Sequence, residues 1–340
     1  MASSLKFAVL GIEHRHIFGM AQNMIDVGAE LVGWWNDGNS PLRDSFVERF
    51  PDASHITDIS TILKNPEIDL VLIAAISRDR AGLAVQAMEA GKDVMSDKPG
   101  CTTLEQLAAL QECVTRTGRI WTVNFSERFE VASMTKAVEL VGEGAIGRVI
   151  QTIGMGPHRL NKATRPGWFF DREAYGGILT DIGSHQIDQF LYITGSDDAE
   201  ITMSNVANYA NSETPELQDF GEIALKSSKG HGYIRVDWYT PDALPNWGDG
   251  RLTILGTEGY IELRKYVDVA GVEGIDHLYL VNGNRCEKID CSDAGLPYFS
   301  RLTNDIRDRT ETAVTQVHTF KTMELAIRAQ LMAEKRNCQT

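Results

Sequence analysis

The sequence lacks the features that mark several large classes of protein. Its five cysteines form no Cys-x-x-Cys pair, which indicates neither a disulfide framework nor a structural zinc site. No run of about 18 apolar residues occurs, and the opening segment shows no basic stretch followed by an apolar one. We therefore expect a cytoplasmic, reducing location and no membrane partner.

Basic residues are also in short supply. The chain carries 33 Lys and Arg against 47 Asp and Glu, for a net charge of −14. Nucleic acids and anionic membranes require basic surfaces, so we expect neither as a partner. What the chain does have is typical of a globular protein: 43% hydrophobic and 24% charged residues, and 340 residues, enough for two domains of about 150 each.

The first third of the chain alternates between strand-like and helical segments. We expect strands over residues 5–10, 30–35, 70–75, 93–96 and 120–125, and helices over 17–27, 80–90 and 103–116, with a further helix opening at Ser40-Pro41. The continuous apolar stretch at 70–75 is typical of a parallel strand buried on both faces. The pattern predicts an α/β Rossmann domain, a doubly wound parallel sheet with right-handed crossovers, over residues 1–125.

The pattern changes after Ser126. Strands are expected over residues 149–155, 201–208, 222–226, 233–239, 252–255 and 260–263, with helices over 134–141 and 314–335. Strands that follow one another through short turns favour antiparallel pairing. Over residues 126–340 we therefore expect an α+β domain with a largely antiparallel open sheet.

The first expected strand-to-helix turn has part of a dinucleotide-binding pattern. Such a turn uses three glycines, but Glu13 and His16 take the second and third positions here. The start of the following helix still offers N–H groups and a positive dipole to an anion. Glu13 would repel a diphosphate, so its side chain should point away from it or toward the substrate. The candidate cofactor-binding residues are Gly11, Ile12, His14 and Arg15; the alternative is a turn that binds no ligand.

The second strand ends at Asn36-Asp37. An acidic residue at this place accepts hydrogen bonds from the adenosine ribose and repels a 2′-phosphate, whereas Asn36 can bind either form of the cofactor. Asp37 therefore favours NAD, with NADP as the second possibility. The alternative is that Asp37 is only a turn residue before Gly38.

Asp97-Lys98-Pro99 directly follows the strand at 93–96, and ligands bind at the carboxyl ends of strands in such sheets. The Lys98 ammonium can hold a substrate oxygen. The alternative is an ordinary surface lysine in a turn.

A second chemical pattern lies on an expected helix after Gly177. Asp181, His185 and Asp188 are spaced i, i+4 and i+7 and share one helix face. A histidine beside a carboxylate is a candidate general base, and the alternative is a solvated polar face. His14 and His16 form a His-x-His pair, but with no further matched ligand in the sequence we expect no metal ion.

Together these segments resemble the glucose–fructose oxidoreductase, inositol dehydrogenase and rhizopine-catabolism (Gfo/Idh/MocA) family. The resemblance rests on the first turn, on Asp97-Lys98-Pro99 and on the Gly-Gly-(x)3-Asp-x-Gly-x-His-x-x-Asp helix, and it extends to segments 124–129 and 256–259. The family's usual Glu-Lys-Pro is Asp-Lys-Pro here. Its frequent Thr-Pro-Asn corresponds to Ala75, Ile76 and Ser77, which join Lys98, Asn36 and Asp37 as candidate cofactor-binding residues.

The resemblance implies an NAD(P)-dependent oxidoreductase that transfers a hydride to or from a hydroxyl or keto group of a sugar, polyol or related small molecule. It implies catalytic roles for Lys98, which grips the reacting oxygen, for His185, which accepts its proton, and for Asp181, which orients both. We expect the substrate pocket to be bordered by these three residues and by His158, Arg159 and Trp168. Arg159 or Arg165 can clamp a carboxylate or a phosphate.

The family resemblance also implies that the domain at residues 126–340 binds the substrate and forms oligomers, in a homodimer or homotetramer. Two other functions stay open. One is a lyase or hydrolase that oxidises a sugar derivative transiently with tightly bound NAD. The other is a nucleotide-binding regulator without turnover.

Overall fold

The computed structural model describes residues 4–337, which form two units. The first contains the chain up to Asn124 together with Pro166–Gly176 and Pro297–Met323. The second contains Phe125–Arg165, Gly177–Leu296 and the chain from Glu324 onward. The chain first passes from the first unit to the second between Asn124 and Phe125, next to the expected boundary after residue 125. The two later segments of the first unit are not part of the boundary that the sequence predicts.

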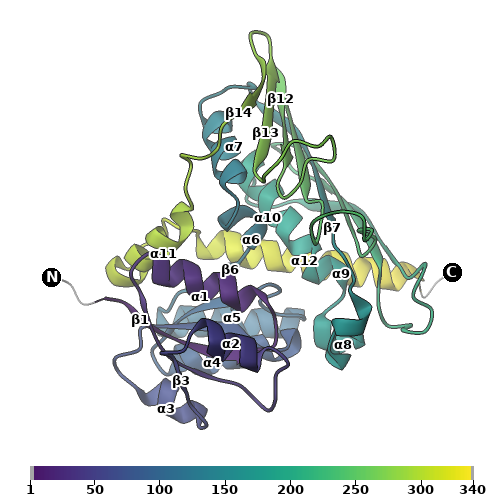
Figure 1. Cartoon of the computed structure of the whole chain (residues 1–340). Helices are drawn as coiled ribbons and strands as arrows, with labels where there is room; N and C mark the ends of the chain where they lie inside the picture. The colour runs from purple at the N-terminus through teal and green to yellow at the C-terminus, as the bar shows by residue number, and fades with distance from the viewer. Residues whose placement is uncertain (1–3, 338–340) are drawn as a thin grey trace. The chain divides into compact units, whose positions relative to one another are not determined.

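The first unit holds a parallel sheet in the strand order β3-β2-β1-β4-β5-β6. Most of this unit is drawn in purple and blue in Figure 1, where β1, β3 and β6 are labelled. Its strands are β1 Lys6–Ile12, β2 Glu30–Trp35, β3 Ser54–His55, β4 Leu70–Ala74, β5 Asp93–Asp97 and β6 Trp121–Asn124. Strand β4 is buried along its whole length, as its apolar sequence predicts. Strand order reverses between β1 and β4, the place where such sheets bind ligands. The expected Rossmann sheet is confirmed.

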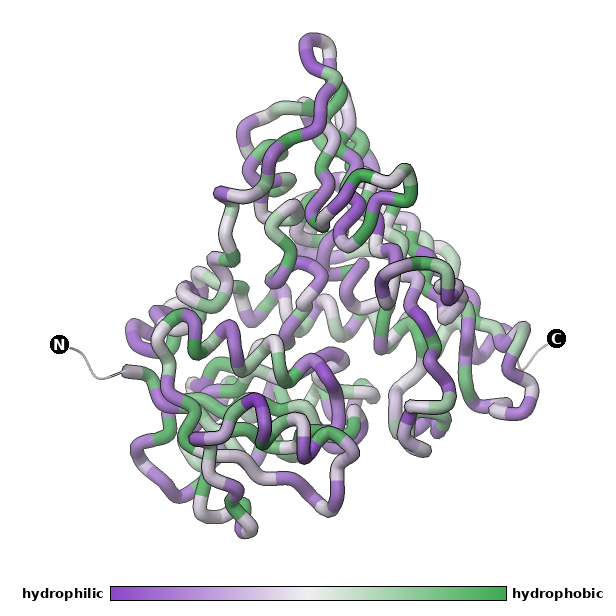
Figure 2. Tube along the Cα trace, viewed as in Figure 1, coloured by the Kyte–Doolittle hydropathy of each residue, from purple (hydrophilic) through white to green (hydrophobic). Residues whose placement is uncertain are grey.

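The helices of the first unit follow the expected alternation. They are α1 His16–Asp26, α2 Arg43–Arg49, α3 Ile59–Lys64, α4 Arg80–Glu89, α5 Leu104–Thr117, α8 Arg172–Tyr175 and α11 Pro297–Asp308, with the short 3-10 helices η1 Ser77–Asp79 and η3 Gly167–Phe170. Helix α1 is amphipathic, and hydrophobic and hydrophilic colours alternate along it (Figure 2). Right-handed crossovers place α1 and α4 on opposite faces of the sheet.

The expected helix start at Ser40-Pro41 is wrong, because α2 begins at Arg43. Ser40 has other partners: its hydroxyl donates to the Ile12 carbonyl at 2.8 Å and accepts from the Leu42 amide at 3.2 Å. It therefore joins the end of β1 to the turn before α2 instead of capping a helix.

Aromatic contacts explain why late segments return to the first unit. The rings of Trp121 on β6 and Phe320 on helix α12 (Gln316–Asn337) stack at 5.0 Å. The Thr122 and Tyr298 hydroxyls lie 3.0 Å apart. These contacts bury the last strand of the sheet under a segment almost 200 residues away, which no local pattern reveals.

The second unit contains a sheet in the order β14-β13-β12-β11-β7-β10-β9-β8. Its strands are β7 Val149–Pro157, β8 Glu200–Ala207, β9 Phe220–Lys226, β10 His231–Asp237, β11 Arg251–Gly256, β12 Gly259–Arg264, β13 His277–Asn282 and β14 Cys286–Ile289. Within residues 4–337, β7 and β10 pair in parallel and the other neighbours are antiparallel. The largely antiparallel sheet is confirmed.

One face of this second sheet is covered by helices. Helix α10 (Gly183–Thr194) packs on β7, β9 and β10, and α7 (Ala132–Gly142) packs on β12 and β13. The remaining helical segments of this unit are α6 Ser126–Phe129, η2 Lys162–Thr164, α9 Ile178–Asp181 and the later part of α12. On the other face the side chains of Ile153, Met155, Leu255 and Tyr260 are half-buried or exposed. Among the described residues, no helix combines the length and the hydropathy that a membrane crossing requires.

Candidate active site

The turn between β1 and α1 begins at a glycine that cannot be replaced. Gly11 has φ +81°, and a Cβ there would lie 2.5–2.6 Å from the backbone and Cβ of Ala75. Just beyond it, the Glu13 and His14 amides donate to the Ala74 carbonyl at 2.9 and 3.1 Å. These two amides are therefore committed to β4, unlike those of a glycine-rich turn that face a diphosphate.

Glu13 is held by the end of the second strand. The Asn36 side-chain oxygen accepts from the Ile12 amide at 2.8 Å, and its amide nitrogen donates to a Glu13 carboxylate oxygen at 2.9 Å. This bond satisfies the acidic side chain that replaces the second glycine and directs it toward β2.

A cavity of about 650 Å³ opens at the carboxyl ends of β1, β2 and β4, within the first unit. Five of the expected cofactor-binding residues line it: Gly11, Asn36, Asp37, Ala75 and Ile76. Its volume lies in the range of small-molecule sites. Ile12, His14, Arg15, Ser77 and Lys98 do not line this cavity. Sequence reasoning missed Arg78 and Gln86, which do, because nothing in their own sequence segment marks them.

The cavity suits the adenosine half of a dinucleotide. It lies where the strand order reverses, and the acidic Asp37 lines it next to the end of β2. Only Gly11 among the three glycine positions is present, and the neighbouring amides are already bonded. The cavity therefore fits the nucleoside part of the cofactor. Fewer backbone amides of the first turn remain to bind the diphosphate.

Asp97 and Lys98 are buried at the end of β5, so the interpretation of Lys98 as a surface lysine is wrong. The fully buried Arg80 connects this end to β4: its guanidinium donates to the carbonyls of Ala75 at 2.8 Å, Pro99 at 3.1 Å and Lys98. It also lies 3.1 Å from Asp97 Oδ2. Arg80 thus positions the Asp97-Lys98-Pro99 turn.

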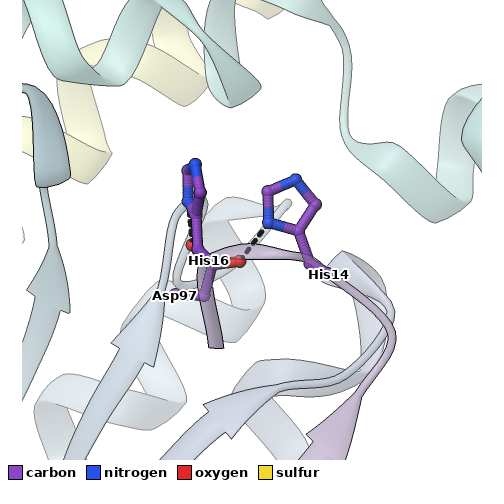
Figure 3. Close-up of side chains that lie close together, drawn as sticks. All are labelled: His14, His16 and Asp97. Carbon is purple, nitrogen blue, oxygen red and sulfur yellow. Dashed lines mark hydrogen bonds and ion pairs between the residues drawn. The ribbon is translucent and has the colours of Figure 1, made fainter. Parts of the chain in front are cut away.

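Two histidines of the first turn meet the Asp97 carboxylate (Figure 3). His16 Nδ1 lies 2.8 Å from Oδ1 and His14 Nδ1 lies 2.7 Å from Oδ2. Burial opposes the ionisation of Asp97, but Arg80 and the two imidazoles outweigh it and hold its pKa well below the usual range. Burial lowers the pKa of His14 to about 3, against the attraction of Asp97.

The predicted catalytic helix of the second unit is two helical segments, α9 and α10, joined at Ile182. Asp181, His185 and Asp188 are all buried, so the interpretation as a solvated polar face is wrong. Asp188 is committed to Arg128, whose guanidinium donates two bonds of 2.7 Å to its carboxylate. The Phe125 ring lies 6.3 Å from the His185 ring, edge to face.

A buried charge network beside His185 was missed at the sequence level. Glu127 Oε2 accepts from Lys265 Nζ at 2.7 Å and from the Gln186 amide at 2.9 Å, and Lys265 also donates to Gln189 at 2.9 Å. Burial works against the charge of Glu127, but Lys265, His185 and His158 hold the pKa of its carboxyl well below the usual range. Both histidines therefore share the field of one carboxylate. Glu127 lies in segment 124–129, which is part of the family resemblance, but no role was assigned to the residues of that segment.

The other expected substrate residues fall in different places. His158 Nδ1 lies 3.0 Å from the Gly156 carbonyl, and its ring contacts Trp238 and Trp247 at 5.4 and 4.7 Å. The Arg159 guanidinium donates to the carbonyls of Pro241, at 2.9 Å, and Leu244, so it fastens a loop. Trp168 belongs to the first unit, on η3, whereas His158 and Arg159 belong to the second.

Two family models match the chain. The model described as "Oxidoreductase family, NAD-binding Rossmann fold" matches residues 5–125, and the Gfo/Idh/MocA C-terminal domain model matches residues 134–262. The scyllo-inositol 2-dehydrogenase (NAD(+)) of Bacillus subtilis is 30% identical over 270 residues, 77% of this chain and 74% of that protein. The levoglucosan dehydrogenase of Pseudarthrobacter phenanthrenivorans is 29% identical over 57% of this chain and 49% of that protein.

A solved structure of a protein from Erwinia carotovora atroseptica has a TM-score of 0.94 and 47% identity to this chain, covering 97% of this chain and 99% of that one. By contrast, the chain spans about half the length of the first curated relatives that it matches.

Proposed function

Because the chain belongs to the Gfo/Idh/MocA family of oxidoreductases, we propose that it is an NAD(P)-dependent dehydrogenase. It transfers a hydride between the nicotinamide cofactor and a hydroxyl or keto group of a sugar, a polyol or a related small molecule. The observation that carries this proposal is the cavity at the reversal of strand order in the NAD-binding Rossmann unit, lined by Asp37.

The cofactor is held by the residues of that cavity. Asp37 accepts from the ribose hydroxyls, and Gly11 lets the first turn approach the ligand closely. Ala75 and Ile76 form part of the apolar wall. When bound, the nicotinamide supplies the hydride chemistry.

The substrate oxygen is handled by the chain's own ionisable groups. In this proposal Lys98 donates to the reacting oxygen and His185 accepts its proton, with Asp181 as the residue that orients them. Lys98 and His185 are buried, so little water competes for their hydrogen bonds. Lys265 is paired with Oε2 of Glu127, so these two buried charges near His185 balance each other.

Assembly and location belong to the same proposal. The half-exposed apolar side chains on the face of the second sheet that its helices leave uncovered support a homodimer or homotetramer. The cytoplasmic location expected from the sequence stays a prediction.

The test is a substrate screen. Purified protein is incubated with NAD⁺ or NADP⁺ and a panel of polyols, aldoses and anhydrosugars, and NADH or NADPH is followed by absorbance, with product analysis in parallel. Reduced cofactor in proportion to product supports the dehydrogenase. Product without reduced cofactor indicates the lyase or hydrolase alternative, and cofactor binding without any product indicates the regulator.

A further inference from the structure

Two histidines of the first turn, of which His16 replaces a missing glycine, lie next to one buried carboxylate. The Nδ1 atoms of His14 and His16 each lie next to one oxygen of the Asp97 carboxylate (Figure 3). The two ring centroids are 4.4 Å apart and the ring planes are at 85° to each other. Along the sequence, the His-x-His pair has no third matched group, which is why no metal ion was expected. Asp97 is such a group, 81 residues beyond His16 along the chain.

The contacts determine how the imidazoles are protonated. An ionised carboxylate only accepts hydrogen bonds, and a nitrogen lone pair 2.7–2.8 Å from its oxygens would be repelled. Nδ1 of each ring therefore carries the hydrogen, and the lone pair of the neutral ring lies on Nε2. In Figure 3 both Nε2 atoms lie on the side of the rings opposite to Asp97.

This arrangement is the one that metal-binding histidines use. A histidine ligand usually donates its second ring N–H to a carboxylate, which sets the tautomer and the ring orientation. Here Nδ1 of His16 is hydrogen-bonded to Oδ1 of Asp97 at 2.8 Å, and Nδ1 of His14 lies 2.7 Å from Oδ2 of the same carboxylate. The side chains of His14 and His16 are 19% and 28% exposed, whereas Asp97 is fully buried, so a small ligand can reach the rings but not the carboxylate.

The supporting residues hold the cluster in place. The guanidinium of Arg80, 3.1 Å from Asp97 Oδ2, balances its charge, and the His14 amide is bonded to the Ala74 carbonyl. Because Asp97 is already paired with Arg80, the ligand atoms in this site are imidazole nitrogens rather than carboxylate oxygens. Such nitrogens suit Zn²⁺, Co²⁺, Ni²⁺ and Cu²⁺, whereas Mg²⁺ and Ca²⁺ prefer oxygen ligands.

We propose that Nε2 of His14 and Nε2 of His16 bind one divalent transition-metal ion such as Zn²⁺, with Asp97 as the carboxylate that orients both rings. Water or an oxygen atom of a bound small molecule completes the coordination. The inference does not depend on the proposed dehydrogenase activity, since it concerns only the first turn and the end of β5.

The test is metal binding by protein that a chelator has stripped. All samples carry Cys286→Ser, which removes an exposed thiol that can bind zinc by itself. Titration calorimetry with Zn²⁺ should give one saturable site, and Co²⁺ should give visible bands of nitrogen and oxygen ligation. Excess Mg²⁺ should not displace either ion.

Single substitutions in the cluster test which residues bind the metal ion. His14→Gln and His16→Gln should each weaken Zn²⁺ binding by about 100-fold, and Asp97→Asn by about 10-fold to 100-fold, the usual effect of an outer carboxylate. The matched controls His55→Gln and Asp79→Asn, both at exposed positions, should bind like the parent. Circular dichroism verifies folding. Absence of a saturable site in the parent, or unchanged binding in both His14→Gln and His16→Gln, would overturn the proposal.

Discussion

The side-chain amide of Asn36 donates to the carboxylate of Glu13 at 2.9 Å and so holds the acidic residue that stands in the second glycine position. Glu13 also lines the cofactor cavity, where its negative charge acts against a diphosphate. The degraded glycine pattern is therefore an electrostatic feature of the site as well as a steric one.

Glu13→Gln should tighten NAD⁺ binding by about 3-fold to 10-fold, the effect of removing one partly screened like charge. The amide keeps an oxygen that can accept from Asn36. Quenching of protein fluorescence measures the Kd, with Glu48→Gln on α2 as the exposed control. Weaker NAD⁺ binding in Glu13→Gln would show that the carboxylate itself binds the cofactor.

Asp37 should decide the choice between the two cofactors. It repels a 2′-phosphate, so the wild-type protein should bind NAD⁺ more tightly than NADP⁺. Asp37→Ser should shift the ratio of the two Kd values toward NADP⁺ by about 10-fold or more, since Arg78 also lines the cavity. Titration of both cofactors into both proteins measures the ratio. A wild-type preference for NADP⁺ would contradict the role given to Asp37.

Lys98→Ala and His185→Ala should each lower turnover by about 100-fold or more, the contribution of a positioned acid–base group. Lys98→Arg should not restore activity, because a planar guanidinium does not replace a compact ammonium. NAD⁺ affinity should stay near the wild-type value in His185→Ala. Steady-state kinetics with a substrate from the screen, together with cofactor titration, measure both effects. His231→Ala, at an exposed position on β10, is the control. Near-normal turnover in His185→Ala would remove the histidine from the proposed mechanism.

Lys265→Met should lower the free energy of unfolding by about 3–5 kcal/mol at pH 7, because it leaves Glu127 buried without its cation. In the wild type, Glu127 has a depressed pKa, so its stabilising effect is present above the unfolded pKa and is lost as the pH falls through the folded one. In Lys265→Met, burial dominates and raises the pKa of Glu127. The difference between variant and wild type should therefore shrink as the pH falls from 7 to 5.

Urea unfolding at the two pH values measures this difference. Lys226→Met, at an exposed position on β9, is the control and should change stability by less than about 0.5 kcal/mol. An equal loss of stability at both pH values would mean that Glu127 is not the group left uncompensated.

The uncovered face of the second sheet should bury itself against a second copy of the chain. Light scattering should give a dimer or tetramer at micromolar concentration. Leu255→Glu together with Tyr260→Glu adds two negative charges to that face and should shift the protein toward the monomer. The control pair Val269→Glu and Val272→Glu alters exposed apolar residues outside the strands. A monomeric wild type would contradict the prediction.

Much of the fold is local and could be predicted from the sequence. A short apolar stretch such as Leu70–Ala74 between turn residues indicates a buried strand. Gly11 has a positive φ, which favours glycine, and the Thr103 side chain caps α5 by accepting from the Gln106 amide. Strands β13 and β14 were missed. Residues of β14 are exposed on one edge of the sheet, so burial imposes no apolar alternation on them. The family could be recognised because its motifs are short and contiguous.

The sequence by itself determined the order of most elements, the Rossmann character of the first unit and the identity of the candidate groups Lys98, Asp181 and His185. Only the tertiary structure decided their surroundings. It buried Lys98 and paired Asp188 with Arg128, and it brought His14 and His16 onto Asp97 and Lys265 onto Glu127. These pairs are between 60 and 138 residues apart, and hydrophobic periodicity carries no information about which charged side chains meet at such separations. The close packing of strand ends and helix faces makes those contacts, because a buried charge is stable only where the fold supplies its partner.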